Sequence, residues 1–187
     1  MISGTEKFMY DLTGFANRNG RDSVKYQRAS IAAKTLIAYF NLHQNPWEMV
    51  DVGRLLDNYD LRILDLPEAI WGFTLQLDDT ATTIAINQKL TADQARYVAV
   101  HEIGHIACAH PNQFHNCLQE PWQPTHEEFE ANIVAAYLLI PHLVMSTTLK
   151  PEAPSLSNND IEEIAHHYLV PTDLVLLRQE LFNLASY

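Results

Sequence analysis

The sequence is poor in basic residues. It has 12 Lys and Arg against 23 Asp and Glu, which gives a formal net charge of −11 at pH 7. A chain of this charge repels the phosphate backbone of nucleic acid at long range, so we do not expect direct nucleic-acid binding. The same charge favours a protein partner that presents a basic surface.

Cysteine is scarce, and long apolar runs are missing. Cys108 and Cys117 are the two cysteines of the chain; two are too few for a disulfide framework, and we expect reduced thiols. No stretch approaches the roughly 18 apolar residues that a membrane-spanning helix needs. The N-terminus lacks the charged and apolar segments of a secretory signal, and no glycine-rich phosphate loop is present. We therefore expect a cytoplasmic protein without a membrane association.

Length and composition favour one domain. The chain has 187 residues, of which 47% are hydrophobic, which is enough for one core and tight for two. We predict an irregular N-terminal arm over residues 1–23, a core over 24–150 and a C-terminal helical pair over 151–187 that packs on the core.

The apolar spacing predicts an α+β fold. Helical periodicity predicts helices over 24–40, 45–59, 91–110 and 125–140, and two short helices near 160–167 and 171–183. Strands are expected at 61–66, 70–77 and 82–87, the last two joined as a hairpin. We expect a small, mostly antiparallel sheet that packs on the helices.

The segment VAVHEIGHIACAH, from Val98 to His110, places three polar residues within the five positions 101–105, where nearly all the neighbouring residues are apolar. His101 and His105 are four residues apart and so share one helix face, a spacing that suits two ligands of one tetrahedral zinc ion. Glu102 lies about 100° round the helix, where it can reach a metal-bound water as the general base of a zincin. Burying three such side chains costs several kcal/mol unless something pairs them.

A third ligand is expected from the following helix, which offers Glu127, Glu128 and Glu130. Projection at about 100° per residue places Glu130 at the centre of an apolar face, Glu128 on the opposite side and Glu127 on the flank. A carboxylate in the middle of an apolar face indicates coordination or pairing. We predict Glu130 as the third zinc ligand, with Glu127 as the substitute. An ion pair between Glu130 and an arginine is the alternative.

The sequence HEIGH, followed by EFEANIVAAYLLIP, resembles the motif pair of the ImmA/IrrE family of zinc metallopeptidases. The matching positions of the second motif are Glu128, Glu130, Ala131, Asn132, Ala135, Leu138, Leu139 and Pro141. The resemblance implies a single zincin-like domain, Zn²⁺ held by His101, His105 and Glu130, and Glu102 as the catalytic base. It also implies cleavage of a specific intracellular regulator, such as a DNA-binding repressor or an antitoxin, in phage or stress regulation.

We therefore predict a zinc endopeptidase. The alternatives are a sensor or adaptor module that binds zinc without turnover, and a structural zinc protein. Glu102 and the open fourth position of a His₂Glu site favour catalysis. The strand at 82–87 is expected to be an exposed edge that pairs with an extended substrate. Cys108, on the face of His101, is expected to be a small core residue. The loop residues His110 and His115 are expected to be exposed rather than to support a zinc ligand or contact the substrate.

Overall fold

The computed structural model describes residues 22–78, 81–111, 125–149 and 155–185. These residues form seven helices and a three-stranded sheet: α1 Asp22–Tyr39, α2 Val52–Leu56, β1 Asp60–Leu64, β2 Gly72–Asp78, β3 Ala81–Asn87, α3 Ala92–Ala107, α4 His126–Leu139, α5 His142–Thr148, α6 Asn158–Tyr168 and α7 Thr172–Ala185. Nearly all of the predicted N-terminal arm lies outside the described residues, as do His115 and Cys117.

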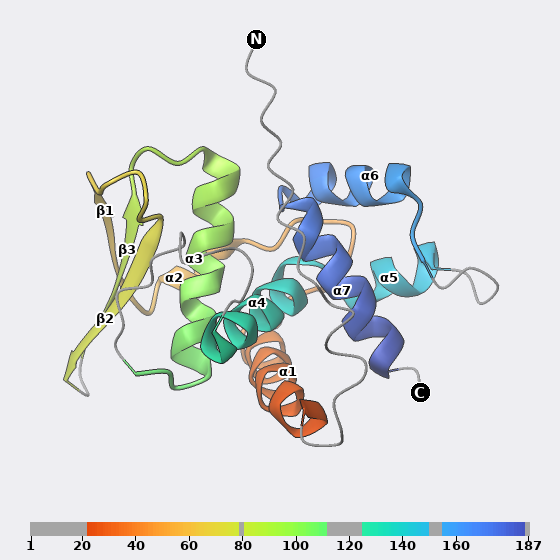
Figure 1. Ribbon diagram of the computed structural model, residues 1–187, viewed down its shortest axis with the longest axis horizontal. Coiled ribbons are helices and arrows are strands. Elements are labelled where there is room, and N and C mark those ends of the chain that lie inside the picture. Colours follow the sequence, from red (N-terminus) through yellow and green to blue (C-terminus); the bar gives the residue numbers. More distant parts are fainter. Residues whose placement is uncertain (1–21, 79–80, 112–124, 150–154, 186–187) are drawn as a thin grey trace, which may run out of the picture.

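Helix α3 lies between the sheet and helices α4, α5, α6 and α7 (Figure 1). On one side it contacts β2 and β3, and on the other it contacts α4. Helix α4 contacts α1 and α7 as well, so it lies at the centre of the helical part. The predicted α+β class is confirmed, and the histidine-bearing helix has the sheet on one side and the glutamate-bearing helix on the other.

The sheet has the strand order β1-β3-β2. Strands β2 and β3 form the predicted antiparallel hairpin, whereas β1 runs parallel to β3, so the sheet is mixed rather than mostly antiparallel. The expectation that residues 82–87 form an exposed edge is wrong, because β3 is the central strand. Its buried run Ile84, Ala85 and Ile86 is typical of a strand that is covered on both faces. The edge strand beside α3 is β2.

Capping residues fix where the two central helices begin. Thr91 and Gln94 form a capping box at the start of α3, as predicted. At the start of α4, the side chain of Thr125 accepts a hydrogen bond from the backbone N–H of Glu128. These caps determine the register of both helices, and with it the direction of every side chain that the site uses.

The predicted helix over 45–59 is wrong in its start. Asn45 accepts a hydrogen bond from the backbone N–H of Trp47, which forms a turn, and Asp51 caps the five-residue helix α2 instead. A side chain that caps a helix also stabilises an isolated turn, so the NPWE pattern alone does not distinguish the two. Helix α5, which follows Pro141, has no counterpart in the prediction.

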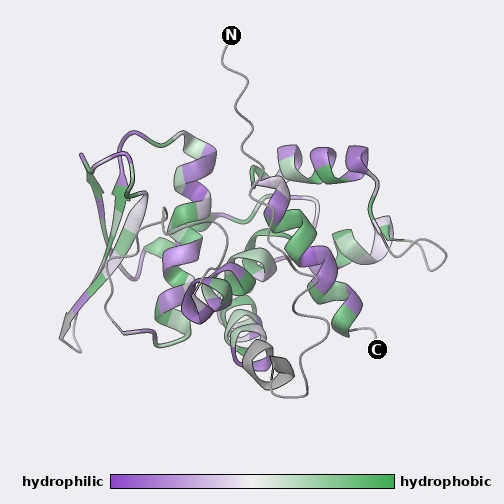
Figure 2. Ribbon diagram, in the orientation of Figure 1, coloured by the Kyte–Doolittle hydropathy of each residue, from purple (hydrophilic) through white to green (hydrophobic). Residues whose placement is uncertain are grey.

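Ten of the 14 residues of α4 are buried, so this helix is covered on nearly all sides. Figure 2 shows hydrophilic bands along α3 beside otherwise hydrophobic segments in the middle of the molecule. None of the described helices is by itself long and apolar enough to cross a membrane; α4 and α5 pass such a test only as a pair, and a 77° bend separates them.

Candidate metal centre

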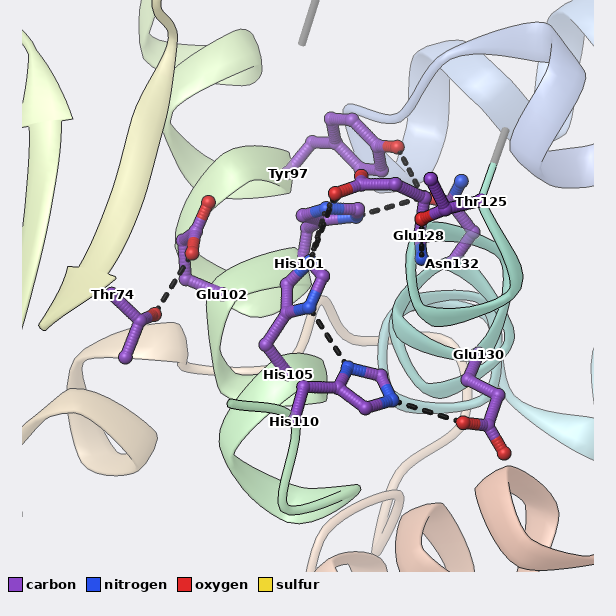
Figure 3. A network of polar contacts seen from close by, with 10 residues as sticks. All are labelled: Thr74, Tyr97, His101, Glu102, His105, His110, Thr125, Glu128, Glu130 and Asn132. Atoms are coloured by element: carbon purple, nitrogen blue, oxygen red, sulfur yellow. Dashed lines mark hydrogen bonds and ion pairs between the residues drawn. The ribbon is translucent and has the colours of Figure 1, made fainter. Parts of the chain in front are cut away.

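Three donor side chains meet where α3 faces the start of α4 (Figure 3). The Nε2 atoms of His101 and His105 lie 3.0 Å apart. One carboxylate oxygen of Glu128 lies 3.1 Å from His101 Nε2, and the other lies 3.6 Å from His105 Nε2. Both histidines are buried, and the side chain of Glu128 is 22% exposed. The two histidines are therefore shielded from solvent, and solvent can reach the site from the side of Glu128.

A close crossing of the two helices brings these donors together. A Cβ atom on Gly104 would lie only 2.7 Å from the carbonyl oxygen of Ala131 and 2.8 Å from its Cα atom. Glycine at this position lets the backbones of α3 and α4 approach within reach of short polar side chains. Ala131 and Asn132 come three and four residues after Glu128, and together the three residues form the face of α4 that meets α3.

His101 has a second partner that fixes its ring. Its Nδ1 atom lies 2.8 Å from the side-chain oxygen of Asn132, which also accepts a hydrogen bond from the Tyr97 hydroxyl at 2.6 Å. An acceptor at Nδ1 holds the ring proton there and directs the lone pair of Nε2 toward Glu128. A role for Asn132 was not predicted, although its position four residues after Glu128 on one helix face is a signal that predicts such a pair.

His105 also has a second partner, and it comes from the residues that end α3. The Nδ1 atoms of His105 and His110 lie 2.9 Å apart, and Nε2 of His110 lies 2.9 Å from a carboxylate oxygen of Glu130. The side chains of His110 and Glu130 are only 3% and 2% exposed. The side chain of His110 is therefore buried at the site, contrary to the expectation of an exposed loop histidine.

The structure corrects the projection that chose Glu130. Glu130 is buried as predicted, but it faces His110 and Cys108, while Glu128, placed on the far side by the projection, faces the histidine pair. The reason is that α4 is buried on nearly all sides, so its most apolar face does not indicate the direction of α3. Glu130 pairs with His110 and, at 3.8 Å, with His126 rather than with an arginine. Glu127 is half-buried and is not among the converging donors.

Glu102 lies on the other side of the histidine pair from Glu128 and points toward β2 (Figure 3). It is fully buried, and the hydroxyl of Thr74 donates a hydrogen bond of 2.8 Å to its Oε2 atom. The backbone of β2 comes close to α3 at Gly72, where a Cβ atom would lie 2.6 Å from a Val98 methyl carbon. The predicted base is thus adjacent to an edge strand and is not one of the converging donors.

Burial and charge act in opposite directions on the histidines. Burial alone lowers the pKa of His101, but the hydrogen bond and charge of Glu128, together with Glu102 and Asn132, outweigh it and raise that pKa. Burial lowers the pKa of His110 against the opposing effect of Glu130. Burial, with a smaller effect of Glu130, raises the pKa of the Cys108 thiol to about 11, so this thiol stays protonated at neutral pH.

The converging residues fit a divalent metal ion. Lone pairs that converge repel one another unless a cation lies among them. Tetrahedral ligands with bonds of 2.0–2.1 Å lie about 3.4 Å from one another, and the three donors are 3.0, 3.1 and 3.6 Å apart. Two imidazoles and one carboxylate also leave one coordination position open, as catalytic sites require.

A small hollow adjoins this site between β2 and the end of α3. It is lined by Thr74, Gln76, His105, Ile106, Ala109, His110 and Pro111. The hollow therefore joins the edge strand to one of the two histidines.

Comparison with models of known protein families gives a match. The model of the Peptidase_M78 family, described as the IrrE N-terminal-like domain, matches residues 57–180, which is more than half of the chain. No curated protein matches the chain. The matched range includes the whole sheet, the donors on α3 and α4, and most of α7.

Proposed function

The chain belongs to the family of IrrE N-terminal-like domains, a metallopeptidase family, and from this premise we propose that it is a zinc-dependent endopeptidase. His101, His105 and Glu128 hold the metal, and Glu102 is the general base. The observation that carries the proposal is the convergence of the three donors beside a buried carboxylate. Glu128 replaces Glu130 as the third ligand because of the contacts described above.

The chemistry divides between the metal and the protein. A bound zinc ion would polarise the attacking water and the scissile carbonyl. Glu102 takes the proton of that water and passes it to the leaving amine. The Thr74 hydroxyl, which donates to Glu102 Oε2, orients the carboxylate, and Asn132 holds His101 with its Nε2 atom toward the metal position.

Strand β2 is suited to bind an extended substrate. The backbone N–H of Asn87 donates to the carbonyl of Trp71, and the same antiparallel register pairs Phe73 with Ala85. Phe73 and Leu75 therefore direct their N–H and C=O groups toward β3. Thr74 and Gln76 direct theirs toward the outer edge. A peptide added along this edge passes Glu102 and the adjoining hollow.

A specific regulator is the proposed substrate, namely a DNA-binding repressor or an antitoxin. The family resemblance motivates this choice. A net charge of −11 supports attraction to a protein with a basic nucleic-acid-binding face. Pairing at a strand edge supports cleavage within a flexible linker, because a folded domain offers no extended segment.

Replacement of the base tests the mechanism. We expect Glu102→Gln to keep the fold and one zinc ion per chain while the cleavage rate falls by about 10²–10⁴-fold, since an amide cannot accept the proton of the water. Zinc content is measured by elemental analysis and cleavage by intact mass. Loss of zinc from this variant would show that Glu102 is a ligand and that the assignment is wrong.

Selectivity tests the substrate class. The enzyme is mixed with a helix-turn-helix repressor encoded beside its own gene and, separately, with casein. Cleavage of the repressor at one site with casein intact supports the proposal. Broad digestion of casein contradicts it, and a zinc-loaded protein that cleaves neither favours the sensor or adaptor alternative.

A further inference from the structure

Glu130, which the sequence predicted as a zinc ligand, is linked to the proposed ligand His105 by a series of polar contacts through His110. The chain runs from Nε2 of His105 through its ring to Nδ1, across 2.9 Å to Nδ1 of His110, and from Nε2 of His110 across 2.9 Å to Glu130. Figure 3 shows the ring of His110 between His105 and Glu130.

Counting protons along this chain gives one consistent arrangement. A neutral imidazole carries one N–H, and a carboxylate only accepts. Because Glu130 accepts, the proton of His110 is on Nε2, and Nδ1 of His110 then accepts as well. The proton of His105 must therefore be on Nδ1. This leaves Nε2 of His105 without a proton, and that atom lies 3.0 Å from Nε2 of His101.

We propose that His110 and Glu130 are positioning residues that hold His105 in the tautomer and orientation required for metal binding. This inference rests on the metal site proposed above, and it assigns the two residues a role outside the ligand set. Partners of this kind fix the ring of a metal-bound histidine and are typically worth 10–100-fold in metal affinity.

The backbone at the end of α3 is built to return His110 to the helix. The N–H of His110 donates to the carbonyl of His105 and the N–H of Ala109 donates to that of Ile106, which is the hydrogen-bond pattern of a Schellman motif. Ala109 has a φ of 49°, a left-handed conformation that costs a residue with a Cβ about 1 kcal/mol. This strained residue, Ala109, is the one that turns the backbone so that His110 faces His105.

A second metal site is the competing use of the same residues, because donor atoms of Cys108, His110 and Glu130 lie within 4.8 Å of one another. Proton counting separates the two. A metal on Nε2 of His110 would leave the His110 proton on Nδ1, directed at Nδ1 of His105. The proton of His105 would then be on Nε2, the atom that the first metal needs. With neutral rings, a metal ion on Nε2 of His110 therefore excludes a metal ion on Nε2 of His105.

Two substitutions of His110 test the proposal. His110→Leu removes both contacts, whereas His110→Gln keeps an oxygen to accept from His105 and an N–H₂ group to donate to Glu130. Zinc affinity is measured by competition with a chelator, and the His105 tautomer is read from ¹⁵N shifts of its ring in zinc-free protein, assigned with His105→Gln. Circular dichroism checks the fold, and Cys108→Ala and His166→Gln, the latter at an exposed position of α6, are the matched controls.

We expect His110→Leu to lower zinc affinity by about 10–100-fold and to move the His105 proton to a mixture of both ring nitrogens. His110→Gln should recover most of the loss, and both controls should resemble the wild type. Unchanged affinity and ¹⁵N shifts in folded His110→Leu would overturn the proposal while leaving the zinc site intact. Two zinc ions per chain, one of them lost in Cys108→Ala, would overturn it in favour of a second site. Failure of the wild type to bind zinc refutes the proposed function itself.

Discussion

Glu128 is the residue on which the metal site depends most directly, because both of its carboxylate oxygens face Nε2 atoms, at 3.1 and 3.6 Å. We expect Glu128→Gln to weaken zinc binding by more than about 100-fold, the upper range for an outer partner, because a neutral amide oxygen is a poorer ligand. Chelator competition measures the change. Glu127→Gln is the matched control, since it removes a neighbouring carboxylate that is not among the donors.

The same pair of variants also tests how α4 is rotated relative to α3. A loss confined to Glu128→Gln supports the close face formed by Glu128 and Asn132. A loss of equal size in Glu127→Gln would mean that α4 is rotated relative to α3, and the ligand assignment would be abandoned.

At this scale the sequence predicted what helix geometry alone determines. His101, Glu102 and His105 share one turn of helix, so their relative directions follow from about 3.6 residues per turn. The choice between Glu128 and Glu130 depends on how α4 packs against α3, which is not local information. The position of His110 depends on the positive φ of Ala109. A positive φ is uncommon for residues other than glycine, so the sequence gives no reason to expect it.

The crossing of α3 and α4 is the contact between elements that the site needs most. We expect Gly104→Ala to destabilise the protein by about 1–3 kcal/mol, the usual cost of adding a group to a packed interface. The added Cβ meets backbone atoms of Ala131, which cannot rotate away as a side chain can. Separation of the helices also moves Glu128 from the histidines, so zinc affinity falls with stability. Denaturant unfolding and chelator competition measure the two effects.

Gly53→Ala is the control for this variant. Its added Cβ meets only the end of the Asp51 side chain, at 3.0 Å, and Gly53 is exposed. It should leave zinc affinity unchanged. A Gly104→Ala protein that binds zinc as tightly as the wild type would contradict the importance of the crossing.

Strand β2 is the element proposed to bind substrate, and proline can test it. Gln76→Pro removes a backbone N–H that is directed toward the outer edge and keeps the ladder to β3, a position where strands tolerate proline. We expect a higher KM for an extended peptide substrate with zinc affinity unchanged. Gln76→Ala, which removes the side chain but keeps the N–H, should be close to wild type. Equal effects of the two variants would point to the side chain instead of the strand edge.

The starts of α3 and α4 and the β2–β3 hairpin were predicted correctly, whereas the place of β3 in the sheet was not. The caps of α3 and α4 follow from Thr91 and Thr125, whose hydroxyls accept from the first turn of each helix. The position of β3 in the centre of the sheet follows from its pairing with β1, which lies about 20 residues earlier in the chain. Alternation along a strand gives its faces, but it does not give its neighbours.

At the scale of the whole molecule, the end of α4 joins the first and last helices. His43, which follows α1, contacts the carbonyl of Leu138 through Nε2 at 2.9 Å. From α7, the Nε atom of Arg178 donates to the carbonyl of Ile140 at 3.1 Å, and its guanidinium lies over the ring of Tyr137. Burial lowers the pKa of Arg178 to about 10, so it stays charged at neutral pH.

This junction makes the stability of the fold sensitive to acid. Burial lowers the pKa of His43, the hydrogen bond to Leu138 opposes that effect, and the charge of Arg178 adds to it. The folded state thus binds fewer protons than the unfolded chain, whose histidine pKa is about 6.5. The contribution of His43 is complete above that value and declines as the pH falls toward the lower folded pKa. His101 acts in the opposite direction in metal-free protein, because its folded pKa is raised and its contribution is lost as the pH rises.

A comparison of variants isolates His43 from the other histidines. His43→Gln keeps an N–H₂ donor for the carbonyl of Leu138 but does not titrate, whereas the other histidines, His101 and His110 among them, are the same in both proteins. We expect the urea midpoint of metal-free wild type to fall further than that of His43→Gln between about pH 7.5 and about pH 5.5, because only the wild type has the His43 ring, whose partial burial opposes protonation. A fall of equal size in both proteins would show that His43 does not couple the pH to the junction at α4.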